Sequence, residues 1–446
     1  MLRRKLYDKL VDWKRESAGS TALLVEGARR VGKSCLVEQF GNAEYESTLL
    51  IDFSKAPDEI FDIFKHETYD LDFLFAKLSA FYGVALHPRE SLVVFDEVQL
   101  CPWARQLIKH LVADGRYDYI ETGSLITLRV NTEGILIPSE EERISMYPLD
   151  FEEFLWALGD DQSMEYVRTC FNREAPLGQA VHRKLLNVFR QYLLVGGMPK
   201  AVSVYAESKD FSRVDRTKRT ILGLYREDVA KFAGKEASRV RAIFDQIPSQ
   251  LSQHDKRFVL SSLEKNARSR AYEDAFMWLT EAMVVNPCYK SLDPCVGLAL
   301  NADHARLKCY LNDTGLLVSQ VFEGGSPGGD DLYRALLFDK LGINEGMFIE
   351  NAVAQMLVAS GHDLYFYAND DRASAENRME IDFLVQCGKR VSPIEVKSSV
   401  SRRHASLDKF KKKFGKRIGQ SYVACSKDLE RVGDVLYVPY YMAALI

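Results

Sequence analysis

A glycine-rich segment that ends in lysine and serine is the first feature of this sequence that could do chemistry. Residues 27–34 read Gly-Ala-Arg-Arg-Val-Gly-Lys-Ser, which has the spacing G-x-x-x-x-G-K-[ST]. An apolar run, Thr21–Glu26, precedes the segment, and a run of helical character, Cys35–Phe40, follows it. A loop between a strand and a helix turns its amides and the helix N-terminus toward an anion. The segment therefore predicts a polyphosphate site.

The two residues that end this motif have separate expected roles. We expect Lys33 to reach the β- and γ-phosphates of ATP, and Ser34 to hold Mg²⁺ through its hydroxyl. ATP and Mg²⁺ are therefore the predicted cofactors. The other nucleotide contacts are expected along the loop and at the start of the helix, at Gly27, Ala28, Arg29, Arg30, Val31, Gly32 and Cys35.

An acidic pair follows at the end of a second apolar run. Residues 91–99 read Ser-Leu-Val-Val-Phe-Asp-Glu-Val-Gln. A continuous apolar run is typical of a strand buried on both faces, and an acidic pair at its end is costly unless it faces a ligand. We expect Asp96 to orient the Mg²⁺ shell and Glu97 to polarise the attacking water. The predicted reaction is therefore ATP hydrolysis.

Two hydroxyl side chains end a third predicted strand, Tyr117–Ser124. Ligands bind at the carboxyl ends of strands in doubly wound sheets, so Thr122 and Ser124 are expected near the γ-phosphate. The alternative for Ser124 is a simple helix N-cap.

Three carboxylates and a lysine form a second constellation near the end of the chain. Glu395 and Lys397 are two residues apart in an apolar strand, so both project from one face. Asp382 can join them from the neighbouring predicted strand, and Glu350 from a helix upstream. Glu350, Asp382 and Glu395 are the predicted metal ligands, and Asp382, Glu395 and Lys397 the predicted catalytic groups for phosphodiester cleavage. A salt-bridged strand pair, or a fold that no longer cuts, are the alternatives.

Basic residues are concentrated directly after this constellation. A solvated helix face is the common explanation of such a run, and contact with a DNA backbone is the alternative. The residues are Lys397, Arg402, Arg403, Lys409, Lys411, Lys412, Lys413, Lys416 and Arg417.

Composition limits the class of protein. The chain has 446 residues and a formal net charge of −4, so two to four domains are expected and any nucleic-acid surface must be local. Its eight cysteines are scattered without a framework spacing, which predicts reduced thiols and a cytoplasmic protein. No apolar run reaches membrane-spanning length, and the N-terminus lacks the apolar core of a secretion signal.

The pattern of predicted elements divides the chain into four parts. Strands alternate with helices over 1–150, as in a parallel α/β sheet, whereas only helices are predicted over 151–235. Residues 236–322 are predicted to form three helices and a hairpin, the pattern of a winged helix, and residues 330–446 a last α/β unit after a linker at 324–331. Lys265, Arg268 and Arg270 are expected at the DNA-facing helix of that module; a solvated basic turn is the alternative.

Together these parts resemble the AAA-type ATPases of the AAA_14/DUF4143 group. The resemblance implies an α/β fold: a P-loop AAA-like ATPase domain, a helical lid at 151–235, a winged-helix module, and a restriction-endonuclease-like C-terminal domain of PD-(D/E)XK type. Glu142-Arg143 stands where members often have Gly-Arg. The stretches that carry the resemblance are Gly27–Ser34, Phe95–Gln99, Glu121–Leu125, Pro148–Phe154, Gly196–Pro199, Leu311–Leu317, Glu350 and Glu395–Lys397.

Two functions follow from these observations. The first is a Mg²⁺-dependent ATPase that acts on or near DNA and carries a nuclease-like domain. The second is a nucleotide-dependent switch or interaction protein with slow hydrolysis and no nuclease activity. AAA-type sites commonly take an arginine from a neighbouring subunit, so a homo-oligomer is expected, with Arg129, Arg143 and Arg226 as candidate arginines.

Overall fold

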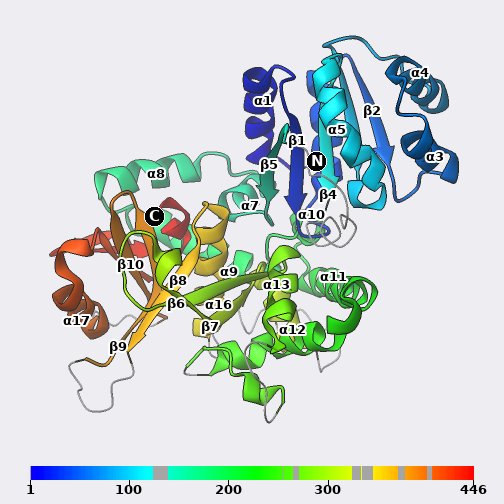
Figure 1. Cartoon of the computed structure of the whole chain (residues 1–446). Coiled ribbons are helices and arrows are strands. Elements are labelled where there is room, and N and C mark those ends of the chain that lie inside the picture. The colour runs from blue at the N-terminus through cyan, green and yellow to red at the C-terminus, as the bar shows by residue number, and fades with distance from the viewer. Residues whose placement is uncertain are drawn as a thin grey trace. The chain divides into compact units, whose positions relative to one another are not determined.

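The structure is a computed structural model that describes residues 2–123, 139–253, 255–264, 271–323, 333, 345–369, 377–398 and 404–446 (Figure 1). It divides into two compact units. One unit comprises Met1–Tyr147 with Glu281–Met283, and the other comprises Pro148–Thr280 with Val284–Ile446. None of the described helices is both long and apolar enough to cross a bilayer.

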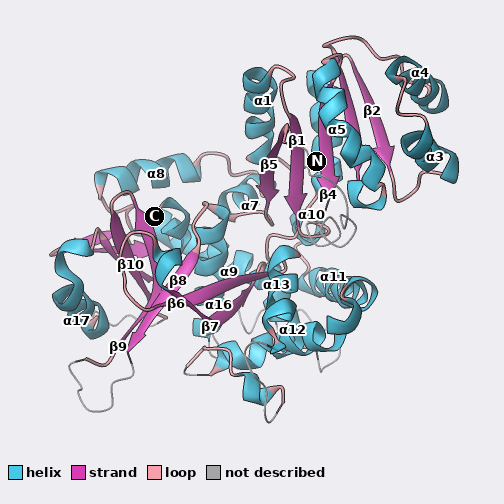
Figure 2. Ribbon diagram, viewed as in Figure 1, coloured by secondary structure: helices cyan, strands magenta, loops and turns pink. Residues whose placement is uncertain are grey.

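The first unit is built on a five-stranded sheet with the order β2-β3-β4-β1-β5. All four neighbouring pairs are parallel, which confirms the predicted parallel α/β sheet. The strands are β1 (Ala22–Gly27), β2 (Ser47–Asp52), β3 (Ser91–Asp96), β4 (Asp118–Gly123) and β5 (Glu141–Met146). The helices are α1 (Leu6–Ser17), α2 (Lys33–Glu44), α3 (Asp58–His66), α4 (Leu71–Tyr82) and α5 (Pro102–Asp114) (Figure 2).

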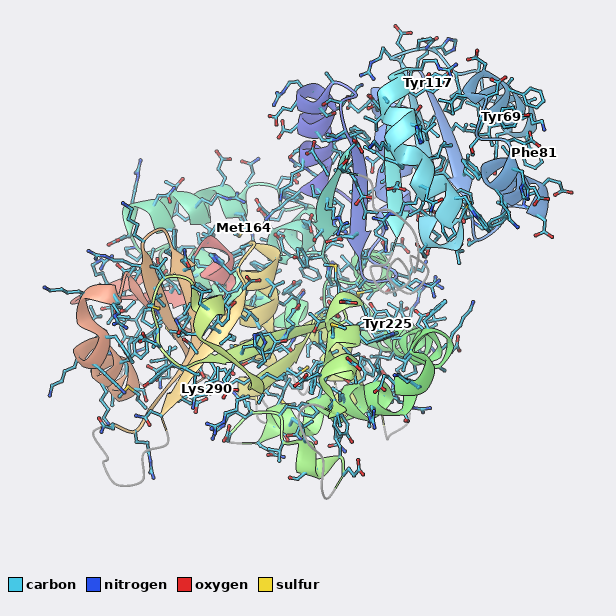
Figure 3. All side chains as sticks on the ribbon, viewed as in Figure 1. Tyr69, Phe81, Tyr117, Met164, Tyr225 and Lys290 are labelled. Atoms are coloured by element: carbon cyan, nitrogen blue, oxygen red, sulfur yellow. The ribbon has the colours of Figure 1, made fainter. Side chains whose placement is uncertain are left out.

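Apolar spacing explains how these helices cover the sheet. Side chains of α3, α4 and α5 pack with those of β1 to β4 into one core, in which Phe95 and Tyr119 are almost fully buried. Two helices, α3 and α4, follow β2, and Asp70 caps α4 by accepting a hydrogen bond from Phe73 N at 3.0 Å. Outside this core, Tyr69 and Phe81 are exposed at the two ends of α4 (Figure 3).

The second unit contains an eight-stranded mixed sheet with the order β12-β13-β11-β10-β9-β8-β6-β7. Its strands are β6 (Val285–Ser291), β7 (Ala302–Leu311), β8 (Leu364–Asn369), β9 (Met379–Cys387), β10 (Arg390–Val396), β11 (Ser421–Cys425), β12 (Glu430–Val432) and β13 (Val435–Pro439). Its helices are α7 (Phe151–Ala157), α8 (Ser163–Arg173), α9 (Gln179–Val195), α10 (Pro199–Ser208), α11 (Phe211–Phe232), α12 (Ala237–Ser252), α13 (Glu273–Glu281), α14 (Thr314–Val321), α16 (Glu345–Ala359) and α17 (Ala405–Phe414).

This sheet corrects one predicted boundary. The hairpin predicted within 236–322 is present as β6 and β7, but β6 also pairs in parallel with β8, from Cys288↔Leu364 to Lys290↔Phe366. The hairpin therefore extends the C-terminal sheet and does not form a separate winged module. Alternating apolar residues predict a hairpin locally but do not say which third strand will pair with it.

Three of the stretches that carry the family resemblance meet within the second unit. Leu149 N donates to Gly197 O at 2.7 Å, and Gly197 N donates to the buried carboxylate of Asp313. A Cβ atom on Gly197 would lie 2.1 Å from Leu149 O, and one on Gly315 would lie 2.4 Å from Val195 O. The glycines are therefore required by close backbone packing between α7, α9 and α14.

Several predicted features lie outside the described residues. They are Ser124, Arg129, the basic residues Lys265, Arg268 and Arg270, the linker at 324–331, and Arg402 and Arg403.

Candidate functional site

The glycine-rich segment forms the turn between β1 and α2. Gly27 is the last residue of β1, and a Cβ atom there would lie 2.4 Å from Met146 O on β5. Arg30 and Gly32 adopt positive φ values of 70° and 95°, in the left-handed region. Such alternation turns successive backbone N–H groups toward one concave side, which suits an anion. Ala28 and Val31 are buried, whereas Arg30 and Cys35 are exposed.

Lys33 begins α2 and is 6% exposed. Its Nζ donates to Gly27 O at 2.9 Å and to Ala28 O at 3.1 Å, so the ammonium group lies against the loop. Burial lowers the pKa of Lys33 to about 8, and the carboxylates of Glu97 and Asp96 oppose that shift. The lysine is therefore held next to both residues of the acidic pair.

Ser34 and Asp96 contact each other directly. Ser34 Oγ donates to Asp96 Oδ1 at 2.8 Å, and Thr122 at the end of β4 donates its hydroxyl to the same oxygen. The parallel sheet causes this meeting, because the carboxyl ends of β1, β3 and β4 lie at one edge. A hydroxyl and a carboxylate are hard oxygen donors, so Ser34 and Asp96 fit Mg²⁺.

Glu97 has an unusual backbone conformation. Its φ of 54° lies in the left-handed region, which a non-glycine residue adopts at a cost. Its N–H donates to Thr122 Oγ1 at 3.4 Å, and its carboxylate accepts a hydrogen bond from the side-chain amide of Gln99. Sequence reasoning did not give Gln99 a role; its place two residues after Glu97 was the available signal.

A second pair of carboxyl groups lies in the same sheet and was missed by sequence reasoning. Glu121 on β4 is fully buried, and burial together with the neighbouring Glu141 raises its pKa well above its ordinary value. Arg105 Nη2 on α5 donates to both oxygens of Glu141, at 3.1 and 2.9 Å. Arg143, a candidate arginine for subunit contacts, donates to Glu141 at 2.9 Å within its own chain.

In the second unit, Glu350 contacts two lysines, Lys256 and Lys308. It is 2% exposed on α16, forms an ion pair with Lys256, and lies 3.4 Å from Lys308 Nζ. Tyr310 donates its hydroxyl to the same carboxylate. Although burial opposes ionisation, Lys308 and Lys256 together hold the pKa of Glu350 below its usual value. The sequence pattern had no signal for either lysine.

Asp382 contacts the same buried lysine but faces a different environment from Glu395. Its Oδ1 lies 3.5 Å from Lys308 Nζ, and its Oδ2 accepts from Val396 N at 2.8 Å. Burial and the nearby Glu350 raise the pKa of Asp382 to about 6. Glu395 instead pairs with Lys397, and burial raises its pKa.

A β-bulge interrupts β9 close to Asp382. Between its pairings with Tyr365 and Tyr367 on β8, β9 advances three residues, from Leu384 to Ile381. The extra residue breaks the strict alternation of side chains between Leu384 and Ile381. In the part of the chain that the structure describes, no group of three or more His, Cys, Asp or Glu side chains is arranged to hold a metal ion. A role of Glu350, Asp382 and Glu395 as metal ligands therefore stays a prediction.

The lysines of α17 are largely engaged within the chain. Lys409 donates to Arg378 O at 3.2 Å, Lys411 pairs with Asp434, and Lys413 donates to Tyr367 Oη at 3.0 Å. Lys412 is exposed. Fewer lysines of α17 are therefore available to contact a nucleic acid than the sequence alone suggests.

Three family models match separate parts of the chain. Residues 19–155 match the AAA domain, residues 186–323 a domain of unknown function (DUF8612), and residues 345–441 another domain of unknown function (DUF4143). The first and third matches agree with the resemblance found from the motifs, and they support an AAA-type ATPase. No curated protein matches the sequence.

Solved structures with partial likeness include ATPases and DNA-bound assemblies. The Walker-type ATPase paby2304 of Pyrococcus abyssi is 16% identical, with 72% of this chain and 96% of that chain covered and a TM-score of 0.44. Drosophila ORC bound to DNA is 13% identical, with 72% and 95% covered and a TM-score of 0.30. Aeropyrum pernix ORC1 in complex with DNA is 10% identical, with 73% and 93% covered and a TM-score of 0.23. These scores are too low to carry an argument about function.

Proposed function

We propose that this protein binds ATP with Mg²⁺ and hydrolyses it. The observation that carries the proposal is the 2.8 Å contact between the hydroxyl of Ser34 and the carboxylate of Asp96, beside the buried ammonium of Lys33. These groups lie at the end of a strand–loop–helix whose φ values turn amides toward an anion. The match of residues 19–155 to the AAA domain supports the same activity.

Each residue has a distinct part in the proposed reaction. Lys33 and the loop amides bind the phosphates, and Ser34 and Asp96 hold the cation, which when bound neutralises negative charge on the transferring group. Glu97 orients the attacking water and accepts its proton on the carboxylate, and Gln99 holds that carboxylate in place. The hydroxyl of Thr122 accepts a hydrogen bond from the backbone N–H of Glu97 and donates one to the carboxylate of Asp96, so it connects the two acidic residues.

The test is ATP turnover by the full-length protein. Lys33→Ala is expected to abolish tight ATP binding, and Glu97→Gln to bind ATP without hydrolysing it. Lys55→Ala is the matched control, because Lys55 is exposed and lies in the same unit. Turnover by Glu97→Gln at the parent rate would show that Glu97 has another role.

For the second unit we propose a binding role near DNA without cleavage. The supporting observation is that Lys256 and Lys308 pair with Glu350 and Asp382, so these carboxylates are neutralised by the chain itself. The exposed residues Lys412 and Lys416 are the remaining candidates for phosphate contacts.

This second proposal has its own test. The protein is incubated with plasmid DNA in Mg²⁺ or Mn²⁺, and its affinity for duplex DNA is measured at increasing salt. Absence of nicking together with binding that weakens steeply with salt is expected. Cleavage that Asp382→Ala removes would instead support an active nuclease, and absence of both effects would favour a protein-interaction role.

A further inference from the structure

A buried arginine that lies outside every sequence motif contacts the phosphate loop. Arg4 precedes α1 and is 8% exposed. Its Nη1 donates to Val31 O at 2.9 Å, and its Nη2 donates to Tyr147 O at 2.6 Å. Val31 belongs to the loop, and Tyr147 directly follows β5, the strand that pairs with β1. One guanidinium thus joins the loop to the edge of the sheet.

The contact of Arg4 with the Val31 carbonyl also sets the direction of the Gly32 N–H. Val31 O and the N–H of Gly32 belong to one peptide unit, and in a trans peptide these two groups point in opposite directions. A donor that holds the Val31 carbonyl on one side therefore fixes the Gly32 N–H toward the other side. Gly32 and Arg30 both have positive φ, so that N–H belongs to the concave row of amides described above.

The helix that follows Arg4 is itself anchored to the first unit. Leu10 and Trp13 on α1 are buried, and Tyr7 Oη donates to Glu44 Oε1 on α2 at 2.8 Å. The position of Arg4 is therefore fixed in two ways: α1, which begins two residues later, is packed against the unit, and the guanidinium is hydrogen-bonded to two carbonyl groups. These contacts restrict the orientation of the amide groups in the phosphate loop before a ligand binds.

We propose that Arg4 is a positioning residue of the nucleotide site, which holds the Val31–Gly32 peptide so that its N–H faces the phosphates. This role rests on the proposed binding of ATP. Without Arg4, the buried Val31 carbonyl loses its charged hydrogen-bond donor, and the Val31–Gly32 peptide can adopt more orientations. Binding of ATP must then also order the loop, which lowers the affinity. A lysine at this position could not reproduce the planar guanidinium group, which donates to Val31 O and Tyr147 O at the same time.

The experiment measures the affinity of the full-length protein for MgATP by calorimetry at low temperature. Arg4→Ala is expected to weaken binding about tenfold or more, and Arg4→Lys about threefold, since one of two charged hydrogen bonds is retained. Arg15→Ala is the matched control, because Arg15 lies exposed on α1 and pairs with Asp12. Its affinity is expected to equal that of the parent.

Thermal unfolding of the nucleotide-free proteins separates positioning from mere support. A lower Tm for Arg4→Lys with an unchanged Kd would overturn the proposal, because the contact would then only stabilise the fold. If Arg4→Ala does not fold, the Kd of Arg4→Lys decides in the same way. Failure of the parent itself to bind MgATP would overturn the proposed function, whereas parent binding with equal Kd for the Arg4 variants overturns the Arg4 role alone.

Discussion

Ser34 Oγ donates a 2.8 Å hydrogen bond to Asp96 Oδ1, although the two residues are 62 positions apart in the chain. The contact exists because the helix after β1 and the end of β3 meet at the same edge of a parallel sheet. It places a hydroxyl and a carboxylate, both suitable for Mg²⁺, beside the buried ammonium of Lys33.

The first prediction concerns the cation. Asp96→Asn keeps the shape and the hydrogen bond to Ser34 but removes the negative charge that favours a divalent ion. We expect the Mg²⁺ concentration that gives half-maximal ATP turnover to rise at least about tenfold. Mg²⁺ titration of turnover measures it, with Asp58→Asn on α3 as the control. An unchanged half-maximal concentration would contradict a role for Asp96 in holding the cation.

The second prediction concerns pH and Lys33. Its pKa in the folded, nucleotide-free protein is about 8, against an ordinary value of 10.5. Phosphate binding needs the protonated amine, so ATP affinity is expected to fall above pH 8, by up to about tenfold per pH unit. Titrations of ATP between pH 7 and about 9.5 test this. A constant Kd across the range would contradict it.

The same shift has the opposite effect on the stability of the nucleotide-free protein. Between about pH 8 and 10.5 the folded state binds fewer protons at Lys33 than the unfolded state does. The contribution of Lys33 to the free energy of unfolding therefore rises with pH in this window. Urea unfolding of the parent and Lys33→Met at pH 8 and pH 10 isolates that contribution, which is absent in the variant.

The third prediction concerns Glu121. Burial and the neighbouring Glu141 raise the pKa of Glu121 well above its ordinary value of 4.5, so between the two pKa values the folded state binds more protons than the unfolded state does. Stability is therefore lost as pH rises above 4.5 toward the folded pKa. Glu121→Gln removes this loss, and we expect it to increase the free energy of unfolding at pH 8 by about 1–3 kcal/mol.

Urea unfolding at pH 5 and pH 8 measures the effect. The gain for Glu121→Gln is expected to be small at pH 5 and larger at pH 8. Glu142→Gln serves as the control, because Glu142 is exposed on β5, which lies on the other side of β1 in the same sheet. An equal effect at both pH values would show that the folded and unfolded states bind the same number of protons at this residue between pH 5 and pH 8, which would contradict a raised pKa of Glu121.

The fourth prediction concerns Lys308. Its ammonium contacts Glu350, Glu380 and Asp382 and is almost fully buried. Lys308→Met leaves these carboxylates without that buried cation, so we expect a loss of about 3–5 kcal/mol in the free energy of unfolding. Lys389→Met, in the exposed turn between β9 and β10, is expected to cost little. A loss below about 1 kcal/mol for Lys308→Met would mean that water or counter-ions reach the carboxylates.

Local spacing alone was sufficient to predict the nucleotide loop and its strand–loop–helix setting. The reason is that the loop needs glycine, lysine and serine at fixed separations along the chain, and those separations can be read directly. The partnership of Ser34 with Asp96 was also predictable, because a parallel α/β sheet brings the ends of its strands to one edge.

Other features were decided by tertiary structure. Arg4 reaches Val31 and Tyr147 from distant segments, and no pattern within its own segment indicates either partner. The burial of Glu121 beside Glu141 depends on which strands flank β1, and strand order is not written in the local sequence. The partner of the hairpin β6–β7 is undetermined locally for the same reason.

The contacts of the C-terminal charged residues could not be predicted from the sequence. The sequence determined that Asp382 and Glu395 lie on apolar strands and that Lys397 comes at the end of one, because alternation and β-branched residues are local properties. The bulge in β9 breaks this alternation close to Asp382, and Lys308 on β7 lies beside both Asp382 and Glu350. A shift of one residue exchanges the faces of a strand, so the pairing of strands in three dimensions, rather than the spacing of residues, decides which charges meet.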